Sequence, residues 1–188
     1  VAVVDRFFNR TLDRLERTIS QAMREALEPA EIDRLLADET WRALKLSSAA
    51  TFRRQGSSLV RDEDGKGWEG CATRELNLQR PMLAPVSTGA PFGLTQDDNG
   101  IDFPPGLRRP VLAVPAADPV RCFALSLYGP HAAGTDLDEN ERAMLSRLAR
   151  FAAAMYAELE AVELRHRIAM LERKVKARAR GTVYVDYL

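Results

Sequence analysis

Two cysteines and two histidines are the side chains of this 188-residue sequence with the most reactive chemistry. Cys71 and Cys122 are too few for a disulfide framework and are typical of a reducing compartment, so we expect a cytoplasmic location. His131 and His166 have no second ligand at metal-binding spacing, and we interpret them as helix-cap or surface side chains. We therefore predict no metal site and no cofactor.

Other catalytic constellations are missing from the sequence. It contains no phosphate-binding loop and no locally supported Ser/His/Asp order. Asp97 and Asp98 are adjacent carboxylates, but a solvated turn explains them, and the spacing of a calcium loop is absent. We predict no catalytic residue and expect that the protein is not an enzyme.

A small-molecule cavity is the site that the sequence favours. In the strand expected over 120–128, alternation places Phe123, Leu125 and Leu127 on a core face and small or mildly polar side chains on the other. This second face suits the floor of a cavity beside the turn-rich segment 87–106, although the nearby aromatic residues are equally suited to anchoring that loop. The candidate ligand-binding residues are Trp68, Arg74, Met82, Phe92, Phe103, Cys122, Ala124 and Tyr128, with Arg74 or Arg80 available for an anionic group.

The charge balance removes two classes of partner. With 27 Lys+Arg and 27 Asp+Glu, the chain has no global attraction to nucleic acid or to an anionic membrane. The basic cluster Arg173–Arg180 is interpreted as the solvated end of a helix, where positive charge complements the helix dipole. No apolar run is long enough to span a bilayer. Because the sequence opens on Val1, we expect a piece of a longer polypeptide, with any membrane attachment outside this fragment.

A long amphipathic helix is predicted at the N-terminus. Apolar residues recur every three or four positions from Val3 to Leu27, which produces one narrow seam along about seven helical turns. A narrow seam on a long helix usually meets another helix, and we expect a second copy of the chain as the partner. The predicted dimerisation residues of this helix are Phe8, Leu12, Leu15 and Ile19.

A second long helix is predicted near the C-terminus. It begins at a capping region at Thr135-Asp136 with acidic residues in its first turn, and its apolar positions change to heptad spacing beyond Val162. Heptad spacing indicates a coiled coil that leaves the domain. The predicted dimerisation residues of this helix are Leu164, Ile168, Leu171 and Val175.

Short strands and turns are expected between the two long helices. After a helix that begins near Pro29, strands over 47–53 and 57–62 join around Gln55-Gly56, and strands over 109–116 and 120–128 form a hairpin. The segment 68–80 is ambiguous, with one helical turn at Leu76, and 81–86 is expected to be a short edge strand.

Three stretches of the sequence resemble the GAF domain family. Arg109-Pro-Val-Leu-Ala-Val-Pro resembles the penultimate strand, Phe123-Ala-Leu-Ser-Leu-Tyr-Gly resembles the last strand, and Asp136 to Leu159 resembles the closing helix. The opening Val4-Asp-Arg-Phe-Phe-Asn-Arg also looks like the segment after the last transmembrane helix of some bacterial membrane proteins with a cytoplasmic GAF domain. The resemblance implies an α+β fold: a GAF/PAS-like antiparallel sheet of five to six strands with helices on one face. To this we add long N- and C-terminal coiled-coil helices.

The sequence lacks the motifs with which members of this family bind several of their known ligands. The Asn-Lys-Phe-Asp-Glu signature of cyclic-nucleotide binding is absent. The Cys-His pair of covalent bilin attachment is missing too, because Ala72 follows Cys71 and Phe123 follows Cys122. Some GAF proteins reduce methionine sulfoxide with cavity cysteines, but nothing in the sequence indicates a low-pKa thiolate or a resolving cysteine.

These observations predict a bacterial GAF-type sensory or regulatory domain that acts in signal transduction. It is expected to be a homodimer through its terminal helices, with an unidentified small molecule as a possible ligand in the cavity between the sheet and the 87–106 loop. Two alternatives stay open: a degenerate GAF domain that acts only as a dimerisation or spacer module, and a thiol-dependent sulfoxide reductase. The expected organisation is an N-terminal helix over 1–28, a GAF-like domain over 29–160, and a coiled-coil extension with a basic tail over 161–188.

Overall fold

The structure is a computed structural model that describes the backbone of residues 2–95 and 101–182 and the side chains of residues 10–95 and 101–178. It divides into two compact units, Val1–Tyr156 and Ala157–Leu188. The predicted dimerisation residue Phe8 and the tail 183–188 lie outside the residues whose side chains are described.

A six-stranded antiparallel sheet forms the centre of the first unit, in the order β3-β2-β1-β6-β5-β4, and confirms the predicted α+β class. The central pair joins β1 to β6, with Thr51 opposite Ser126 and Phe52 opposite Leu125. The first four residues of β1 and all seven residues of β6 are buried, so both faces of this central pair are covered. The strands are β1 (Ala49–Gln55), β2 (Ser58–Val60), β3 (Glu75–Asn77), β4 (Phe92–Gly93), β5 (Leu112–Ala117) and β6 (Cys122–Tyr128).

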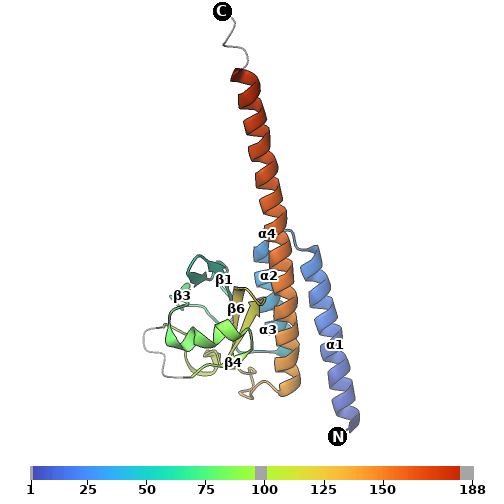
Figure 1. Cartoon of the computed structure of the whole chain (residues 1–188). Coiled ribbons are helices and arrows are strands. Elements are labelled where there is room, and N and C mark those ends of the chain that lie inside the picture. The colour runs from blue at the N-terminus through green and yellow to red at the C-terminus, as the bar shows by residue number, and fades with distance from the viewer. Residues whose placement is uncertain (1, 96–100, 183–188) are drawn as a thin grey trace, which may run out of the picture. The chain divides into compact units, whose positions relative to one another are not determined.

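Helices cover one face of the sheet. Figure 1 shows α2 (Pro29–Arg34), the π-helix η1 (Leu35–Glu39), α3 (Thr40–Leu44) and the first half of α4 (Glu139–Thr182) on this side. Their apolar stripes are at helical spacing, so each helix presents a continuous buried surface to the sheet. The buried residues include Ile32, Leu36, Leu44, Leu145, Leu148 and Ala152.

The opposite face of the sheet is covered by irregular segments and one short helix, η2 (Pro81–Thr88). The prediction of an edge strand over 81–86 is wrong. Pro81 lies in the first turn of η2, where a missing N–H costs nothing, and Pro85 lies inside this short 3-10 helix. The expected helical turn at Leu76 is also wrong, because Leu76 lies in β3 opposite Leu59, and both side chains are fully buried.

Helix α1 (Ala2–Glu25) packs along the first half of α4 within the same unit. Leu12, Ile19 and Met23 are only 5%, 2% and 1% exposed in the single chain. Glu16 binds Arg147 of α4 through both carboxylate oxygens at 2.8 to 3.0 Å. The predicted amphipathic seam exists, but its partner is the chain itself. This corrects the assignment of Leu12 and Ile19 to a dimer interface, while Leu15 is half-buried.

The start of α4 is fixed by a reciprocal hydrogen-bonded cap. Glu141 N–H donates to Asp138 Oδ1 at 2.8 Å, and Asp138 N–H donates to Glu141 Oε2 at 2.9 Å. This is a capping box, which satisfies two backbone donors that the first helical turn leaves unpaired. The cap therefore lies at Asp138, two residues after the predicted Thr135-Asp136.

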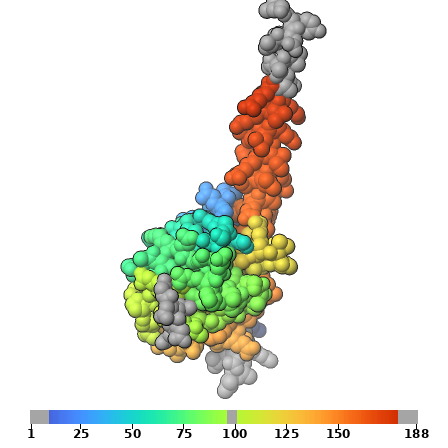
Figure 2. Space-filling model, turned by 60° about the vertical axis from the view of Figure 1, so that its left-hand side comes forward, coloured from blue at the N-terminus to red at the C-terminus, as the bar shows by residue number. Residues whose placement is uncertain are grey.

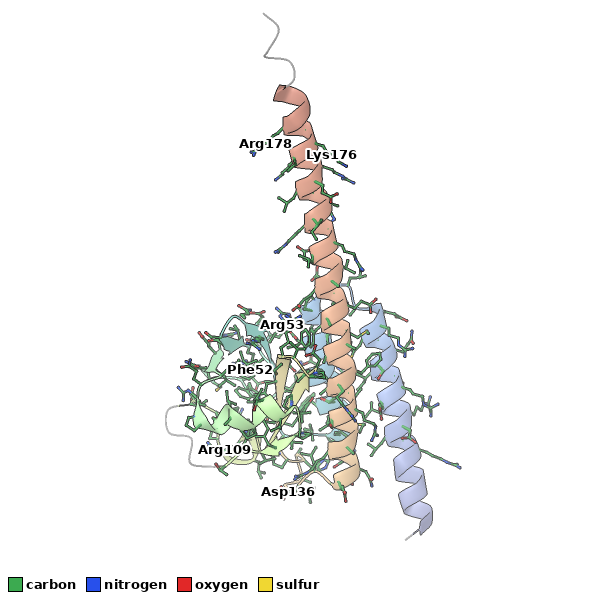
Figure 3. All side chains as sticks on the ribbon, in the orientation of Figure 1. Phe52, Arg53, Arg109, Asp136, Lys176 and Arg178 are labelled. Atoms are coloured by element: carbon green, nitrogen blue, oxygen red, sulfur yellow. The ribbon has the colours of Figure 1, made fainter. Side chains whose placement is uncertain are left out.

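The second unit is the remainder of helix α4. Its apolar side chains are exposed in the single chain, with Leu164 at 59%, Ile168 at 48%, Leu171 at 61% and Val175 at 66%. Figure 3 shows the basic side chains Lys176 and Arg178 projecting from this helix. Among the described residues, no helix combines the length and apolar character needed to cross a bilayer.

Removing the Glu141 carboxylate should destabilise the first unit more than removing its exposed neighbour Glu139. We expect Glu141→Ala to lower the free energy of unfolding by about 2 kcal/mol, because it breaks the capping box and leaves buried donors unpaired. Urea denaturation followed by circular dichroism measures this difference. The control, Glu139→Ala, should change it by less than about 0.5 kcal/mol, and equal losses from both variants would contradict the role of the cap.

Candidate functional site

Aromatic side chains fill the space above the middle of the sheet on the loop side. Trp68 packs edge-on against Phe52 of β1 at 5.5 Å between ring centroids and against Phe103 at 5.9 Å. Trp68 and Phe103 are 1% and 6% exposed. The loop-anchor interpretation therefore describes both side chains, and this part of the expected cavity is occupied by the protein itself.

Arg61 is a buried cation under this aromatic layer. Its guanidinium lies 5.1 Å from the Trp68 ring centroid and donates to the carbonyl oxygens of Thr73 and Cys71 at 3.0 and 3.3 Å and to that of Asp64. Burial lowers the pKa of Arg61 from its usual value. These bonds fasten the segment 62–73 to the sheet. Among the described residues, Arg61 Nε and Trp68 Nε1 have no hydrogen-bond partner, so each can take an internal water.

A pocket of about 300 Å³ lies beside the aromatic layer, between η2 and the β5–β6 turn. In Figure 2 the green segment around η2 forms much of the visible face, and the yellow β5–β6 turn projects beside it. The volume is at the lower end of the range for small-molecule sites. The pocket is lined by Arg54, Leu78, Leu83, Ala84, Val86, Ser87, Ala117, Asp118, Pro119, Val120, Arg121 and Cys122.

The pocket has an apolar floor and a charged rim. Arg54 and Arg121 are the basic residues of the lining, and Asp118 is its acidic residue. Asp118 Oδ1 accepts the N–H groups of Val120 and Arg121 at 2.8 and 2.7 Å, and these bonds hold the pKa of its carboxyl below the usual value. Because the Asp118 carboxylate is already hydrogen-bonded to backbone N–H groups of the turn, the lining favours an anionic ligand group.

The two thiols do not have the properties of a catalytic pair. Burial raises the pKa of the Cys122 thiol to about 11, and its Sγ donates to the carbonyl oxygen of Ala124 at 3.1 Å. A thiol with this pKa stays protonated at neutral pH and is a poor nucleophile. Cys71 is half-buried, and its thiol is hydrogen-bonded to the carbonyl oxygen of Asp102.

The eight predicted ligand-binding residues do not come together in one site. Cys122 lines the pocket, while Met82 and Phe92 are half-buried and pack against the aromatic core. Arg74 is exposed, and its guanidinium binds Asp64 at 2.7 Å. Trp68 and Phe103 belong to that core, and the remaining two, Ala124 and Tyr128, face the helices.

Ala124 and Tyr128 are on the helix side because they pair with Arg53 and Ala49 of β1, and a β-bulge in β6 turns only Cys122 to the loop side. Ala116 pairs with Ala124 while Ala117 pairs with Cys122, so Phe123 is an extra residue in β6. Strict alternation would keep Cys122 and Ala124 on one face, and the bulge separates them. Ala124 therefore lies on the helix side with Arg53, its partner on β1, and Tyr128 O–H donates to the carbonyl oxygen of Leu36 at 2.8 Å.

Arg54 and Arg121 are pocket residues that the sequence reasoning missed. A signal for Arg54 was available, because it is two residues after Phe52 on a strand and must share its face. Arg121 had no such signal, because its position depends on the turn geometry set by Asp118.

A buried polar network lies on the helix side of the same strands. Asp33 of α2 accepts the Tyr156 O–H at 2.5 Å and an Arg53 N–H at 2.8 Å, and Arg53 also binds Asp62 at 2.6 Å. Figure 3 labels Phe52 and Arg53, consecutive residues of β1 that serve the loop side and the helix side. Burial raises the pKa of Asp33 to about 6, because desolvation outweighs the Tyr156 hydrogen bond and the Arg53 charge.

Tyr156 connects this network to β6 as well. Its ring stacks on Phe123 with centroids 6.2 Å apart and planes 14° from parallel. Burial raises the pKa of Tyr156 well above its usual value, so the phenol stays protonated and donates a hydrogen bond to Asp33. Phe123 is also covered by the Arg121 guanidinium, 4.3 Å from its ring centroid. The same turn therefore contributes to the pocket and to the contact with α4.

His131 has a structural role at the base of the domain. Its Nδ1 donates to the carbonyl oxygen of Leu44 at 2.7 Å, and its Nε2 lies 3.0 Å from Glu141 Oε2, which agrees with the helix-cap interpretation. A wider hollow of about 790 Å³ lies next to it, between α1, α3 and the segment that leads into α4. Within the described part of the chain, no three His, Cys, Asp or Glu side chains cluster to hold a metal ion.

Comparison with known proteins identifies the fold. No family model and no curated protein sequence matches the chain. Solved structures do. A GAF domain assigned to a sensor histidine kinase of Pseudomonas syringae pv. tomato has a TM-score of 0.65 at 18% identity, covering 92% of this chain and 99% of that one. The GAF domain of a phosphoenolpyruvate-protein phosphotransferase from Coxiella burnetii has a TM-score of 0.64 at 15% identity, covering 83% and 98%.

A third structure with this architecture is an enzyme. Free methionine-R-sulfoxide reductase from Neisseria meningitidis, solved with its substrate, has a TM-score of 0.62 at 16% identity, covering 80% of this chain and 91% of that one. The chain therefore has the GAF fold, as its sequence resemblance implied. Because one fold carries both sensors and an enzyme, function has to be argued from the site.

The pH dependence of stability should depend on Asp33. A carboxyl whose pKa is raised from 3.8 to about 6 in the folded protein stabilises the fold below pH 4 and loses that contribution as the pH rises through 6. Relative to Asp33→Asn, the wild-type protein should lose on the order of 3 kcal/mol between pH 4 and pH 7. Urea denaturation at a series of pH values measures the difference.

The matched control is Asp38→Asn, on the same helical segment, where the carboxylate is 29% exposed and pairs with Lys66. This variant should retain the wild-type dependence on pH. If Asp33→Asn also retained it, the raised pKa would be refuted.

Proposed function

We propose that this chain is a GAF-type sensory or regulatory module that binds a small anionic molecule in the 300 Å³ pocket and transmits occupancy to helix α4. The observation that carries the proposal is a double connection between pocket and helix. Arg54 lines the pocket and its neighbour Arg53 binds Asp33, the hydrogen-bond partner of Tyr156. Cys122 lines the pocket and its neighbour Phe123 stacks on Tyr156.

The dimensions and lining of the pocket limit the ligand. Leu83, Val86 and Cys122 suit a short apolar body, and the basic side chain of Arg54 suits a carboxylate or a phosphate. The aromatic layer of Trp68, Phe52 and Phe103 occupies the space above the sheet where a larger ligand such as a tetrapyrrole would have to lie. We infer a short-chain carboxylate or phosphate ester as the ligand class.

Transmission requires that the ligand bind one arrangement of the protein better than another. Consecutive residues of a strand point to opposite faces, so a ligand that pulls on Arg54 or on the β5–β6 turn changes the strain on Arg53 and Phe123. Arg53 binds Asp33, which accepts the hydrogen bond of Tyr156, and Phe123 stacks on the Tyr156 ring. We propose Tyr156 as the residue where this strain reaches α4, and association of two copies through the exposed seam of residues 157–178 as the output.

A screen with short-chain mono- and dicarboxylates and phosphate esters tests the pocket. A ligand at a hundred times its Kd should stabilise the chain by about 2.7 kcal/mol, visible as a rise in Tm. Arg54→Gln should weaken that ligand at least tenfold by removing a charged hydrogen-bond donor.

Arg74→Gln is the matched control, because Arg74 is equally cationic but pairs with Asp64 away from the pocket. Loss of binding with Arg74→Gln and not with Arg54→Gln would place the ligand elsewhere. If no member of the screen raises Tm, the result favours the spacer alternative, which the filled aromatic core also supports.

With a ligand from that screen, Tyr156→Phe should separate binding from transmission. The phenol is buried on the helix side and does not line the pocket, so Kd should stay within about threefold, which is less than 1 kcal/mol. The change that the ligand causes in the distance between spin labels at position 166 of the two copies should fall by half or more. An undiminished change in the Tyr156→Phe protein would refute the transmission route.

A further inference from the structure

We propose that Asp33 is a proton-controlled latch for the last docked turn of α4: a proton on its carboxyl group keeps Tyr156 docked, and loss of that proton makes release of this turn easier. The proton is an input that the proposed function does not contain. The latch needs no ligand and no residue of the 300 Å³ pocket, so it goes beyond the proposed function and does not rest on it.

Tyr156 is the position at which α4 stops packing against the domain. It is the last residue of the first unit, and within the described part of the chain it is the last buried side chain of α4. Its ring stacks on Phe123, and its phenol donates to Asp33 Oδ1 at 2.5 Å. Segments at the edge of a packed unit open at a lower free-energy cost than its core. The turn around Tyr156 is therefore the part of the docked helix that can be released alone.

The charge of an ionised Asp33 is only partly compensated. The carboxyl group is 4% exposed, and its cationic partner Arg53 is shared with Asp62. Arg53 Nη1 lies 2.8 Å from Asp33 Oδ2, and Arg53 Nη2 lies 2.6 Å from Asp62 Oδ2. One guanidinium group thus serves two carboxylates. A buried carboxylate with a divided partner retains part of its desolvation cost, which protonation removes.

The groups that act on Asp33 come from several elements packed around it. They are Tyr156 of α4, Arg53 of β1, Asp62 and Glu63 after β2, and Tyr128 of β6 through its effect on Tyr156. The hydrogen bond from Tyr156 and the charge of Arg53 favour the ionised carboxylate, whereas burial and the two neighbouring acids favour the protonated form. Burial is the largest of these effects, and the pKa of Asp33 is raised to about 6.

Proton binding favours the docked turn. Release of Tyr156 lets water reach Asp33 and returns the pKa of its carboxyl group toward the usual value. The released state therefore binds a proton more weakly than the docked state, and it gains population as the pH rises through about 6. This direction is opposite to that of an ordinary carboxylate ion pair, whose contacts weaken in acid.

Amide hydrogen exchange of the full chain between pH 4 and pH 7 tests the latch without any ligand. After correction for the intrinsic exchange rate at each pH, the protection of amides 153–157 should fall about tenfold or more as the pH rises. These amides should also exchange well before those of β6, because the last turn opens without global unfolding. Equal protection of the last turn and β6, or protection that does not change with pH, would exclude the latch.

Four variants assign the pH dependence to this network. Asp33→Asn should abolish it, and the control Asp38→Asn, whose carboxylate pairs with Lys66, should retain it. Two other variants keep Asp33 and move the midpoint in opposite directions. Tyr156→Phe removes a hydrogen bond to the carboxylate and should raise the midpoint pH, whereas Asp62→Asn removes a nearby negative charge and should lower it. A pH dependence that survives Asp33→Asn, or a midpoint that stays fixed in the other two variants, would overturn the proposal.

The pocket variant Arg54→Gln separates the latch from the proposed function. Arg54 lines the pocket, and its side chain donates to the carbonyl oxygen of Gly56, outside the Asp33 network. This variant should keep the wild-type pH dependence of protection in the absence of ligand, and a changed dependence would contradict a latch that is independent of the pocket. Failure of the ligand screen would leave the latch in place, and a last turn insensitive to pH would leave the pocket in place.

Discussion

The antiparallel pairing of β1 with β6 is the constraint on which the rest of the domain depends. These strands come from distant parts of the chain and are joined over five residue pairs from Ala49–Tyr128 to Arg53–Ala124. Their pleat sends Phe52 and Leu125 to the aromatic layer, and sends Thr51 and Ser126, whose hydroxyl oxygens are 3.0 Å apart, toward the helices. Neighbouring residues of this pair therefore serve opposite faces of the sheet.

On the loop side of the sheet, aromatic side chains fill the centre and a pocket lies at the margin. Phe52, Trp68 and Phe103 form a continuous edge-to-face layer, which contributes burial and fixed aromatic geometry. Arg61 ties the segment beneath Trp68 to carbonyl oxygens and so keeps that layer in place. What remains is a pocket at the margin, where η2 meets the β5–β6 turn.

A buried polar network around Asp33 links the helix side of the sheet to α4. Burying the Asp33 carboxyl is unfavourable, and its hydrogen bonds to Tyr156 and Arg53 offset part of that cost. These bonds join α2, β1 and the last residue of the first unit. Disturbing any one partner leaves a buried polar group unsatisfied, so the three elements respond together.

Local pattern in the sequence determined most of the elements. Helical spacing located α1 and α4, alternation located the hairpin of β5 and β6, and the resemblance around Leu-Tyr-Gly implied the GAF fold. Helical spacing could not tell which partner covers Leu12 and Ile19, because an apolar seam looks the same whether it meets its own chain or another. The bulge at Phe123 separates this residue from Leu125 and Leu127, which alternation placed on the same face, and a bulge depends on the pairing of two strands. Residue types and spacing are properties of a segment and can be predicted from it, whereas the side that a residue faces and the partner it meets are decided by contacts between segments far apart in the chain.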